Sequence, residues 1–114
     1  MFRWIEAHVT ASLRESLAYV FVSYYEDDCG RRIPDWNAVF HRLGRIFPRA
    51  ALGIGECGTT VEGQKASTLT RYYGMRLDEP RFVGGFFWWY FKRDMVPRQR
   101  PLWAELDALM VRAR

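Results

Sequence analysis

The sequence lacks any apolar run long enough to form a membrane-spanning helix. Such a helix needs about 20 consecutive apolar residues, and no stretch of this chain approaches that length. A signal peptide is also missing from the sequence as written, because charged residues and a histidine interrupt the segment from Met1 to His8. We therefore expect no membrane partner, and a cytoplasmic location is the default without such a signal.

Cysteine and histidine are scarce, with two of each in the chain. Cys29 and Cys57 lack the spacing of a zinc ligand set with His8 and His41, since both histidines fall in predicted helices. The same placement leaves no Ser-His-Asp or Cys-His arrangement for nucleophilic catalysis. We expect no metal site, and nothing in the sequence implies a cofactor.

Acidic residues are outnumbered, with 13 Asp and Glu against 17 Lys and Arg, which gives a net charge of +4. A nucleic-acid-binding surface gathers its basic residues on one face or along one stripe. Here the arginines are scattered along the chain, for example at Arg14, Arg31, Arg42, Arg71, Arg93 and Arg112. We therefore expect no nucleic-acid partner.

Apolar and aromatic residues are what the sequence has in abundance. Hydrophobic residues make up 49% and aromatic residues 17% of the 114 residues, which is too many for a disordered chain. A chain of this length builds one core, and no linker rich in proline or serine divides it. We expect a single domain over residues 1–114.

The apolar pattern predicts helices and strands in alternation. The runs from Leu17 to Tyr25 and from Phe82 to Tyr90 are continuous and rich in β-branched and aromatic residues, as in strands buried on both faces. Apolar residues then recur with a helical period after Asp35, which is a typical helix-capping residue. The expected elements are a helix over 2–16, a strand over 17–25, a helix over 36–47, a strand over 50–56, a helix over 64–73, a strand over 82–90 and a helix from Pro101, with Leu106, Leu109 and Met110 facing inward.

This order of elements indicates a parallel sheet. Strands that alternate with helices pair in parallel through right-handed crossovers. The expected fold class is α/β, with three parallel β/α units preceded by one helix. The strands that begin at Leu17 and Phe82 would form two open sheet edges, which favour pairing with another chain. We expect the isolated chain to self-associate, for example as a homodimer through these edges.

The segment from Gly53 to Gly58 matches the pattern G-x-G-x-x-G at the end of a predicted strand. In dinucleotide-binding folds this loop holds a pyrophosphate at the N-terminus of the next helix. The segment differs from that use, because Glu56 would place a negative charge in the loop and the next helix begins several residues later. Asp78 and Glu79 also precede the third strand, whereas a ribose-binding acid should follow it. A nucleotide-binding α/β domain that uses this loop is one alternative function.

Glu56 is the residue that we expect to carry chemistry, because it ends the second strand. In α/β barrels the C-terminal ends of the strands form the functional face. Tyr24 and Tyr25 end the first strand, and Trp88 and Trp89 end the third, so both pairs should share that face. A carboxylate beside a tyrosine hydroxyl and an indole ring suits a sugar, which stacks its apolar face on aromatic rings. The plainer interpretation is a solvated glutamate that starts a turn.

These segments resemble the last three strands, six to eight, of a retaining glycoside hydrolase from the large clan with a TIM (β/α)₈ barrel, which includes cellulases, mannanases and β-glycosidases. The resemblance implies that this chain is a partial TIM barrel. The motifs that carry the resemblance are Val22-Ser23-Tyr24-Tyr25, Leu52-Gly53-Ile54-Gly55-Glu56-Cys57-Gly58 and Gly84-Gly85-Phe86-Phe87-Trp88-Trp89. In that clan a glutamate that ends strand seven is the nucleophile, a tyrosine after strand six hydrogen-bonds it, and a tryptophan that ends strand eight floors the sugar site. The resemblance implies these roles for Glu56, for Tyr24 or Tyr25, and for Trp88 or Trp89.

The chain departs from this clan in its length and in its carboxyl groups. A complete barrel needs about 250 residues, and retaining hydrolysis needs a second carboxyl group about 5–5.5 Å from the nucleophile. The clan's general acid ends strand four, which would lie upstream of Met1, and we interpret Glu26, Asp27 and Asp28 as a solvated acidic loop. We expect hydrolysis of β-linked sugars by an intact parent barrel and little activity in the isolated chain. A non-catalytic carbohydrate-binding or interaction module is the other alternative.

Cys29 and Cys57 follow the ends of neighbouring predicted strands. Adjacent strands lie about 4.8 Å apart, and a disulfide requires Cα atoms about 4.4–6.8 Å apart. Because the loop at 26–28 can fold back, we expect the two Cα atoms to lie within about 10 Å of each other. The thiols should stay reduced in a cytosolic protein, whereas after export they are able to form a disulfide.

Overall fold

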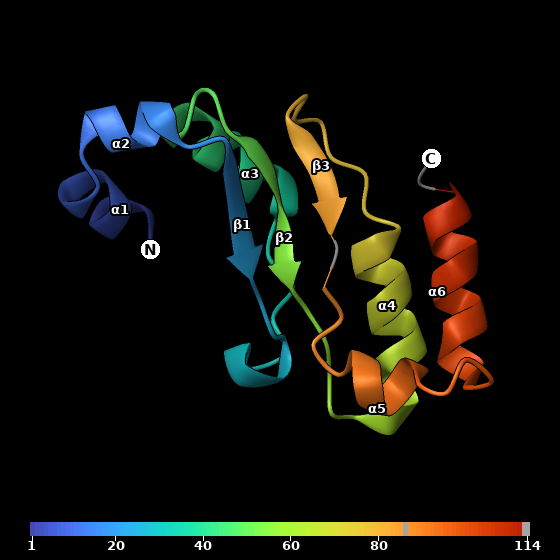
Figure 1. Ribbon diagram of the computed structural model, residues 1–114. Coiled ribbons are helices and arrows are strands. Elements are labelled where there is room, and N and C mark those ends of the chain that lie inside the picture. The colour runs from blue at the N-terminus through green and yellow to red at the C-terminus, as the bar shows by residue number, and fades with distance from the viewer. Residues whose placement is uncertain (86, 113–114) are drawn as a thin grey trace. The chain divides into compact units, whose positions relative to one another are not determined.

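The structure is a computed structural model that describes residues 1–85 and 87–112. In these ranges the chain is a mixed α/β protein with six α-helices and a three-stranded parallel sheet in the order β1-β2-β3 (Figure 1). None of the described helices is long and apolar enough to cross a membrane. The elements are α1 (Phe2–His8), α2 (Ala11–Ser16), β1 (Tyr19–Ser23), α3 (Trp36–Ile46), β2 (Ala51–Glu56), α4 (Lys65–Tyr73), β3 (Phe82–Gly85), α5 (Phe91–Met95) and α6 (Pro101–Arg112), with 3₁₀ turns at Asp27–Cys29 and Glu62–Gln64. The predicted α/β class and the parallel pairing are confirmed.

The chain divides into two compact units, which are described separately below. The first unit contains residues 1–21, 34–53 and 77–83, and the second contains residues 22–33 and 54–76 and the described part of 84–114. The division falls inside each strand, so that every strand begins in the first unit and ends in the second. The expectation of a single domain over residues 1–114 stays a prediction.

In the first unit, the N-terminal region forms two helices, and the prediction of one helix over residues 2–16 is wrong. Val9 has φ −100° and ψ 118°, and Thr10 has φ −62° and ψ 152°, so the backbone is extended between α1 and α2. The Thr10 hydroxyl accepts a hydrogen bond from the Leu13 amide at 3.3 Å and caps the second helix. Threonine competes with the helix for backbone hydrogen bonds in this way, and it therefore favours a cap over a helix interior.

The core of the first unit is built on the apolar face of α3. The helix begins where expected, because the Asp35 carboxylate accepts a hydrogen bond from the Ala38 amide at 3.0 Å. Phe40 is fully buried, and its ring packs edge-on against Phe82 of β3 with 4.8 Å between the ring centroids. The other buried apolar residues of this helix and its C-terminal cap are Trp36, Leu43, Ile46 and Phe47. The predicted amphipathic helix is confirmed.

The buried carboxylate of Glu79 contacts α3 and holds Arg81 beside the C-terminal end of this helix. It accepts a hydrogen bond from Arg81 Nε at 3.1 Å and lies 3.5 Å from His41 Nδ1, while Arg81 Nη1 donates to the Phe47 carbonyl at 2.9 Å. Gly44 leaves room for this pair, because a Cβ atom at that position would collide with the Arg81 guanidinium. Helix α3 is thereby fixed to the segment that leads into β3.

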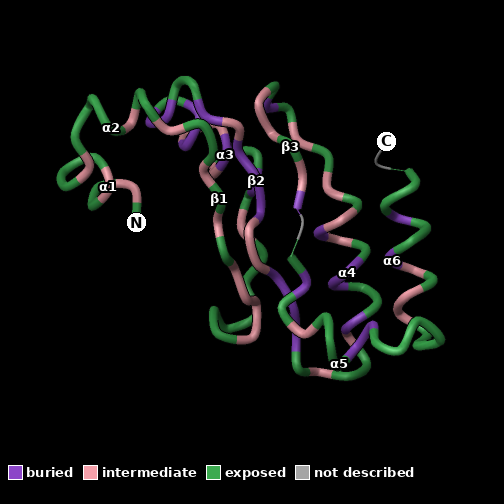
Figure 2. Tube along the Cα trace, in the orientation of Figure 1, coloured by how far each residue is buried: buried purple, intermediate pink, exposed green. Residues whose placement is uncertain are grey.

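In the second unit, α4 packs beside α6 (Figure 1). Leu69 and Tyr72 of α4, Leu106 and Leu109 of α6, and Ile54 of β2 are buried (Figure 2). The predicted inward positions of Leu106 and Leu109 are confirmed. The prediction for Met110 is wrong, because its side chain is 51% exposed. Leu106 and Leu109 lie three residues apart on one helical face, and the next residue along the chain turns away from that face.

The third strand is shorter than the predicted range of 82–90, because β3 ends at Gly85. Phe86, which the sequence placed in this strand, lies outside the described residues. The chain then pairs once more with the end of β2, through an isolated parallel bridge between Cys57 and Trp88. The sequence did not indicate α5, since the continuous aromatic run before it shows no helical period.

Candidate functional site

Glu56 ends β2 and is half-buried, and its carboxylate receives a hydrogen bond from a neighbouring strand end. The Tyr25 hydroxyl donates to Glu56 Oε2 at 3.1 Å, and the Tyr24 amide donates to the Glu56 carbonyl at 2.9 Å. Burial raises the pKa of Tyr25 well above its ordinary value, and the adjacent Glu56 carboxylate raises it further. Tyr25 therefore stays protonated and acts as a neutral hydrogen-bond donor to Glu56.

The two tyrosines after β1 have different contacts. The Tyr24 hydroxyl donates to the Arg32 carbonyl at 2.8 Å, whereas the Tyr25 hydroxyl reaches Glu56. Successive side chains of an extended segment point to opposite sides, so only one of the pair can face the carboxylate. The hydrogen bond to Glu56 that the resemblance implies for Tyr24 or Tyr25 is present, and Tyr25 makes it.

The two tryptophans also separate, as alternation requires. Trp88 is buried, with 2% of its surface exposed, and its indole Nε1 donates to Asp94 Oδ2 at 2.9 Å. Trp89 is 60% exposed, and its amide donates to the Cys57 carbonyl at 2.9 Å. Trp88 is therefore a core residue, and the ring available to a ligand next to the end of β2 is that of Trp89.

Tyr90 is a further aromatic residue at this site that sequence reasoning missed. Its ring lies where a Cβ atom on Gly58 would approach within 3.1 Å, so the glycine after Cys57 makes space for it. The Arg93 guanidinium covers the ring of Tyr90 at 4.4 Å from the centroid. The neighbouring phenol group of Tyr90 also contributes to the raised pKa of Tyr25. The sequence signal was its place in the same aromatic run as Trp88.

The prediction that the acidic loop after β1 is solvated is wrong for Glu26 and Asp27. Arg71 Nη1 donates to both carboxylate oxygens of Glu26, at 2.5 and 2.7 Å, and forms an ion pair with it. Asp27 Oδ2 accepts hydrogen bonds from the Thr59 hydroxyl at 2.8 Å and the Thr60 amide at 3.0 Å, which lower the pKa of Asp27. Only the prediction for Asp28, which is exposed, is confirmed. The partners are distant in sequence, so that no local pattern reveals them.

A second carboxylate of the unit, Asp94, lies in a buried polar cluster. Asp94 Oδ1 accepts from Lys65 Nζ at 2.8 Å and from Arg93 Nε at 3.0 Å, in addition to the indole bond from Trp88. Burial opposes ionisation, but hydrogen bonds from Lys65, Trp88 and Arg93 outweigh it and hold the pKa of Asp94 below its ordinary value. The side chains of Lys65 and Asp94 are only 6% and 2% exposed. This cluster is an internal ion pair with an indole donor.

In the part of the chain that the structure describes, the cysteines and histidines form no group with acidic residues that could bind a metal ion. Cys29 is exposed and Cys57 is buried, and both are free thiols. Burial raises the pKa of Cys57 to about 12. His8 and His41 lie on α1 and α3, as the sequence predicts. The expected distance between the two cysteine Cα atoms stays a prediction.

The glycine pattern does not form the loop of a dinucleotide-binding fold. Gly53 and Gly55 lie within β2, and α4 begins only at Lys65, after the 3₁₀ turn. In the dinucleotide fingerprint the glycines lie in the turn that leads directly into the helix. No element of this segment offers a helix N-terminus to a pyrophosphate beside Gly58.

Comparisons with known proteins give no relative: no protein-family model, no curated protein and no solved structure matches the chain. The site is therefore interpreted from its own geometry.

Proposed function

We propose that this chain supplies the last three β/α units of a retaining glycoside hydrolase barrel, with Glu56 as the nucleophile towards β-linked sugars. The observation that carries the proposal is the 3.1 Å hydrogen bond from Tyr25 to Glu56 at neighbouring strand ends. The sequence resemblance names this pair of residue types in these two positions. The parallel order of β1 and β2 supports it, because the C-terminal strand ends of such barrels carry the catalytic groups.

The environment of Glu56 suits a nucleophile better than those of the other carboxylates nearby. A nucleophilic carboxylate must be ionised, fixed in orientation and free of a cation that would compete with the developing charge on the sugar. Among the described residues Glu56 forms no ion pair, and its donor is the neutral Tyr25 hydroxyl. Glu26 and Asp94, in contrast, are each neutralised by arginine or lysine.

The aromatic residues supply the sugar contacts of the proposal. The Trp89 side chain is 60% exposed. The backbone amide of Trp89 donates a hydrogen bond to the carbonyl of Cys57, which directly follows Glu56. Indole rings bind sugars through the apolar face of the pyranose, while the polar edges stay hydrated. We assign this contact to Trp89 rather than to Trp88, whose ring is buried.

The general acid of the reaction is assigned to no residue of this chain. A general acid must hold a proton at the working pH. Asp94 does not suit this role, because its pKa lies below its ordinary value, and the Glu26 carboxylate is occupied by its ion pair with Arg71. General acid assistance contributes about 10²–10⁴-fold to the rate. Hydrolysis of ordinary glycosides by the isolated chain should therefore be slow, whereas attack by Glu56 on an activated sugar should survive.

Covalent labelling tests the proposal without a general acid. A panel of 2-deoxy-2-fluoro-β-glycosyl fluorides should add one glycosyl group to the chain, because fluoride departs unprotonated and the 2-fluoro group slows release of the ester. Glu56→Gln should abolish the mass increase, and Asp28→Asn, which changes an exposed carboxylate, should keep it. Labelling that persists in Glu56→Gln, or none across the panel, would contradict the assignment.

The panel also separates the catalytic proposal from a non-catalytic carbohydrate-binding module. Such a module is favoured only by the exposed ring of Trp89. It predicts quenching of tryptophan fluorescence by sugars that is lost in Trp89→Ala, with no covalent adduct on Glu56. The catalytic proposal predicts both binding and the adduct.

A further inference from the structure

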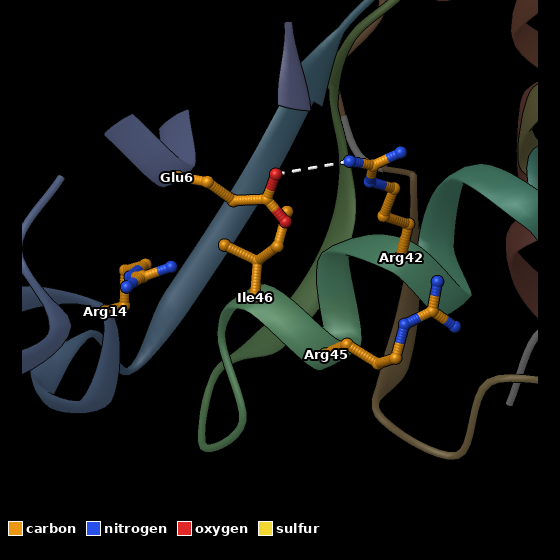
Figure 3. A pocket seen from close by; sticks show the side chains of 5 residues that line it. All are labelled: Glu6, Arg14, Arg42, Arg45 and Ile46. Atoms are coloured by element: carbon orange, nitrogen blue, oxygen red, sulfur yellow. Dashed lines mark hydrogen bonds and ion pairs between the residues drawn. The ribbon is translucent and has the colours of Figure 1, made fainter. Parts of the chain in front are cut away.

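A polar pocket of about 230 Å³ lies in the first unit, and none of its lining residues belongs to the candidate site around Glu56. Its lining comes from the three helices of that unit: Glu6 of α1, Arg14 of α2, and Arg42, Arg45 and Ile46 of α3 (Figure 3). Arg14 and Arg42, which are far apart in the sequence, thus line one pocket together with Arg45. Figure 3 shows the Arg14 and Arg45 side chains on opposite sides of Ile46. The lining residues of α1 and α2 precede β1 and those of α3 precede β2, whereas Tyr25 follows β1 and Glu56 ends β2.

One of the three arginines is already neutralised and fixed. Arg42 Nη2 donates to Glu6 Oε2 at 3.2 Å, and its guanidinium lies over the ring of Phe2 at 4.8 Å from the centroid. Figure 3 shows the Glu6 carboxylate directed at Arg42 across the pocket. Arg42 is therefore held in place by an ion pair and an aromatic face.

The other two arginines have no counter-ion among the described residues. In residues 1–85 and 87–112 the guanidinium groups of Arg14 and Arg45 form no ion pair and no hydrogen bond. Together with the Arg42–Glu6 pair, they give the pocket lining a net charge of +2. Arg45 is exposed and Arg14 is half-buried, and they lie on opposite walls of the pocket. Like charges on the walls of one pocket give it a positive potential that attracts an anion.

The donor chemistry specifies the kind of anion. A guanidinium offers two parallel N–H donors that match two oxygens of a phosphate or a sulfate. A water molecule takes about 30 Å³ of liquid, so this pocket has room for more than a single tetrahedral oxyanion. The buried side chain of Ile46 supplies an apolar wall for the remaining part of a ligand.

We propose that this pocket, the arginine pocket, binds a tetrahedral oxyanion, either free or as the phosphate or sulfate group of a small molecule. Arg14 and Arg45 provide the charge that the anion neutralises, and Arg42 is a positioned third donor whose strength Glu6 limits. The site is independent of Glu56, since none of its residues belongs to the proposed hydrolase site. Its failure or success therefore leaves the proposed function untouched.

The test is a titration of the whole chain with inorganic phosphate, sulfate, a hexose 6-phosphate and the matching unphosphorylated hexose, followed by calorimetry at constant ionic strength. Phosphate or sulfate should bind saturably in the millimolar range or tighter, and the unphosphorylated hexose should not compete. A hexose phosphate that binds more tightly than inorganic phosphate identifies a phosphomonoester site, whereas equal affinity identifies a site for the free ion. Both results support the oxyanion pocket.

Three variants make the test specific. The double variant Arg14→Gln/Arg45→Gln should weaken phosphate binding at least tenfold, whereas Arg49→Gln/Arg112→Gln, which removes the same charge from exposed positions outside the pocket, should change it less than twofold. Glu6→Gln should strengthen binding several-fold, because it frees Arg42. Circular dichroism confirms folding of each variant. No saturable binding, equal losses in the two double variants, or weaker binding in Glu6→Gln would overturn the proposal.

Discussion

Glu56 and Asp94 are two carboxylates of the same unit with opposite environments. Asp94 is 2% exposed at its side chain and accepts hydrogen bonds from Lys65, Arg93 and Trp88. Glu56 is half-buried, and the partner of its side chain among the described residues is the neutral Tyr25 hydroxyl. The first carboxylate is saturated by donors and cations, and the second keeps acceptor capacity that a substrate is able to use.

This difference shows how the unit separates stability from chemistry. Burying an ion pair costs desolvation energy. Removing one partner strongly destabilises the folded protein, because the other charge stays buried without a counter-ion. A partly exposed carboxylate with one neutral donor contributes little to stability, but it remains accessible. The sequence presents both as acidic residues near aromatic ones, and only their partners distinguish them.

Removal of the Asp94 charge should have the largest effect on stability. Asp94→Asn leaves the buried Lys65 ammonium without its internal counter-ion, which should cost about 3–5 kcal/mol. The matched control is Glu62→Gln, since the 85% exposed Glu62 also pairs with Lys65, and an exposed pair is worth less than about 1 kcal/mol. Urea denaturation measures both. Equal, small losses would mean that Asp94 is no more a structural group than Glu62.

The two tryptophans should differ next. Trp88→Phe keeps a ring in the core but deprives the Asp94 carboxylate of its indole donor, a hydrogen bond to a charged group that is worth about 1.5–3 kcal/mol. Trp89→Phe changes an exposed ring and should cost less than about 0.5 kcal/mol. Denaturation midpoints of the two variants provide the measurement. A larger loss for Trp89→Phe would reverse the assignment of core and surface rings.

Acid should act through Asp94 as well. The pKa of Asp94 is lowered in the folded chain, so the native state binds fewer protons than the unfolded state as pH falls. The stability from this group is present above the unfolded pKa of about 3.9 and is lost as pH falls through it towards the folded pKa. Denaturation at pH 6 and at pH 3 should show a loss that is smaller in Asp94→Asn. An unchanged acid loss in that variant would assign it to other groups, such as Asp27.

The smallest effect on stability is expected at Glu56 itself. Glu56→Gln keeps an oxygen that accepts the Tyr25 hydrogen bond and breaks no ion pair among the described residues. We expect a change of less than about 1 kcal/mol in the free energy of unfolding. A loss as large as that of Asp94→Asn would show that Glu56 is a structural carboxylate, and it would remove the contrast on which the proposed function rests.

The sequence predicts the fold well where a local pattern carries the information. Continuous apolar runs located β1 and the start of β3, Asp35 located the start of α3, and Glu56 ends β2 as predicted. The expected burial of β1 and β3 on both faces is wrong, because no residue of β1 is buried and Val83 of β3 is exposed. The break at Thr10 was missed, because its capping role depends on a hydrogen bond rather than on the apolar period. Helix α5 was missed because the preceding aromatic run hides the end of the strand.

The contacts of the site depend on residues far apart in the chain, and these were beyond the sequence. The choice between Tyr24 and Tyr25 required the direction of each side chain, and the roles of Trp88 and Trp89 required their burial. Glu26 and its ion-pair partner Arg71 lie 45 positions apart in the sequence. Because no local pattern reveals this partner, the sequence predicted a solvated loop where the structure has an ion pair.

The rate of covalent labelling in two tyrosine variants tests the central claim most directly. If Tyr25 orients the Glu56 nucleophile, Tyr25→Phe should slow labelling by a 2-fluoroglycosyl fluoride by about tenfold or more, the rate equivalent of one hydrogen bond to a charged group. Tyr24→Phe, whose hydroxyl bonds the Arg32 carbonyl instead, should label within about twofold of the wild-type rate. Peptide mapping should place the sugar on Glu56 in each case. Equal rates in the two variants, or a label on any other residue, would contradict the account.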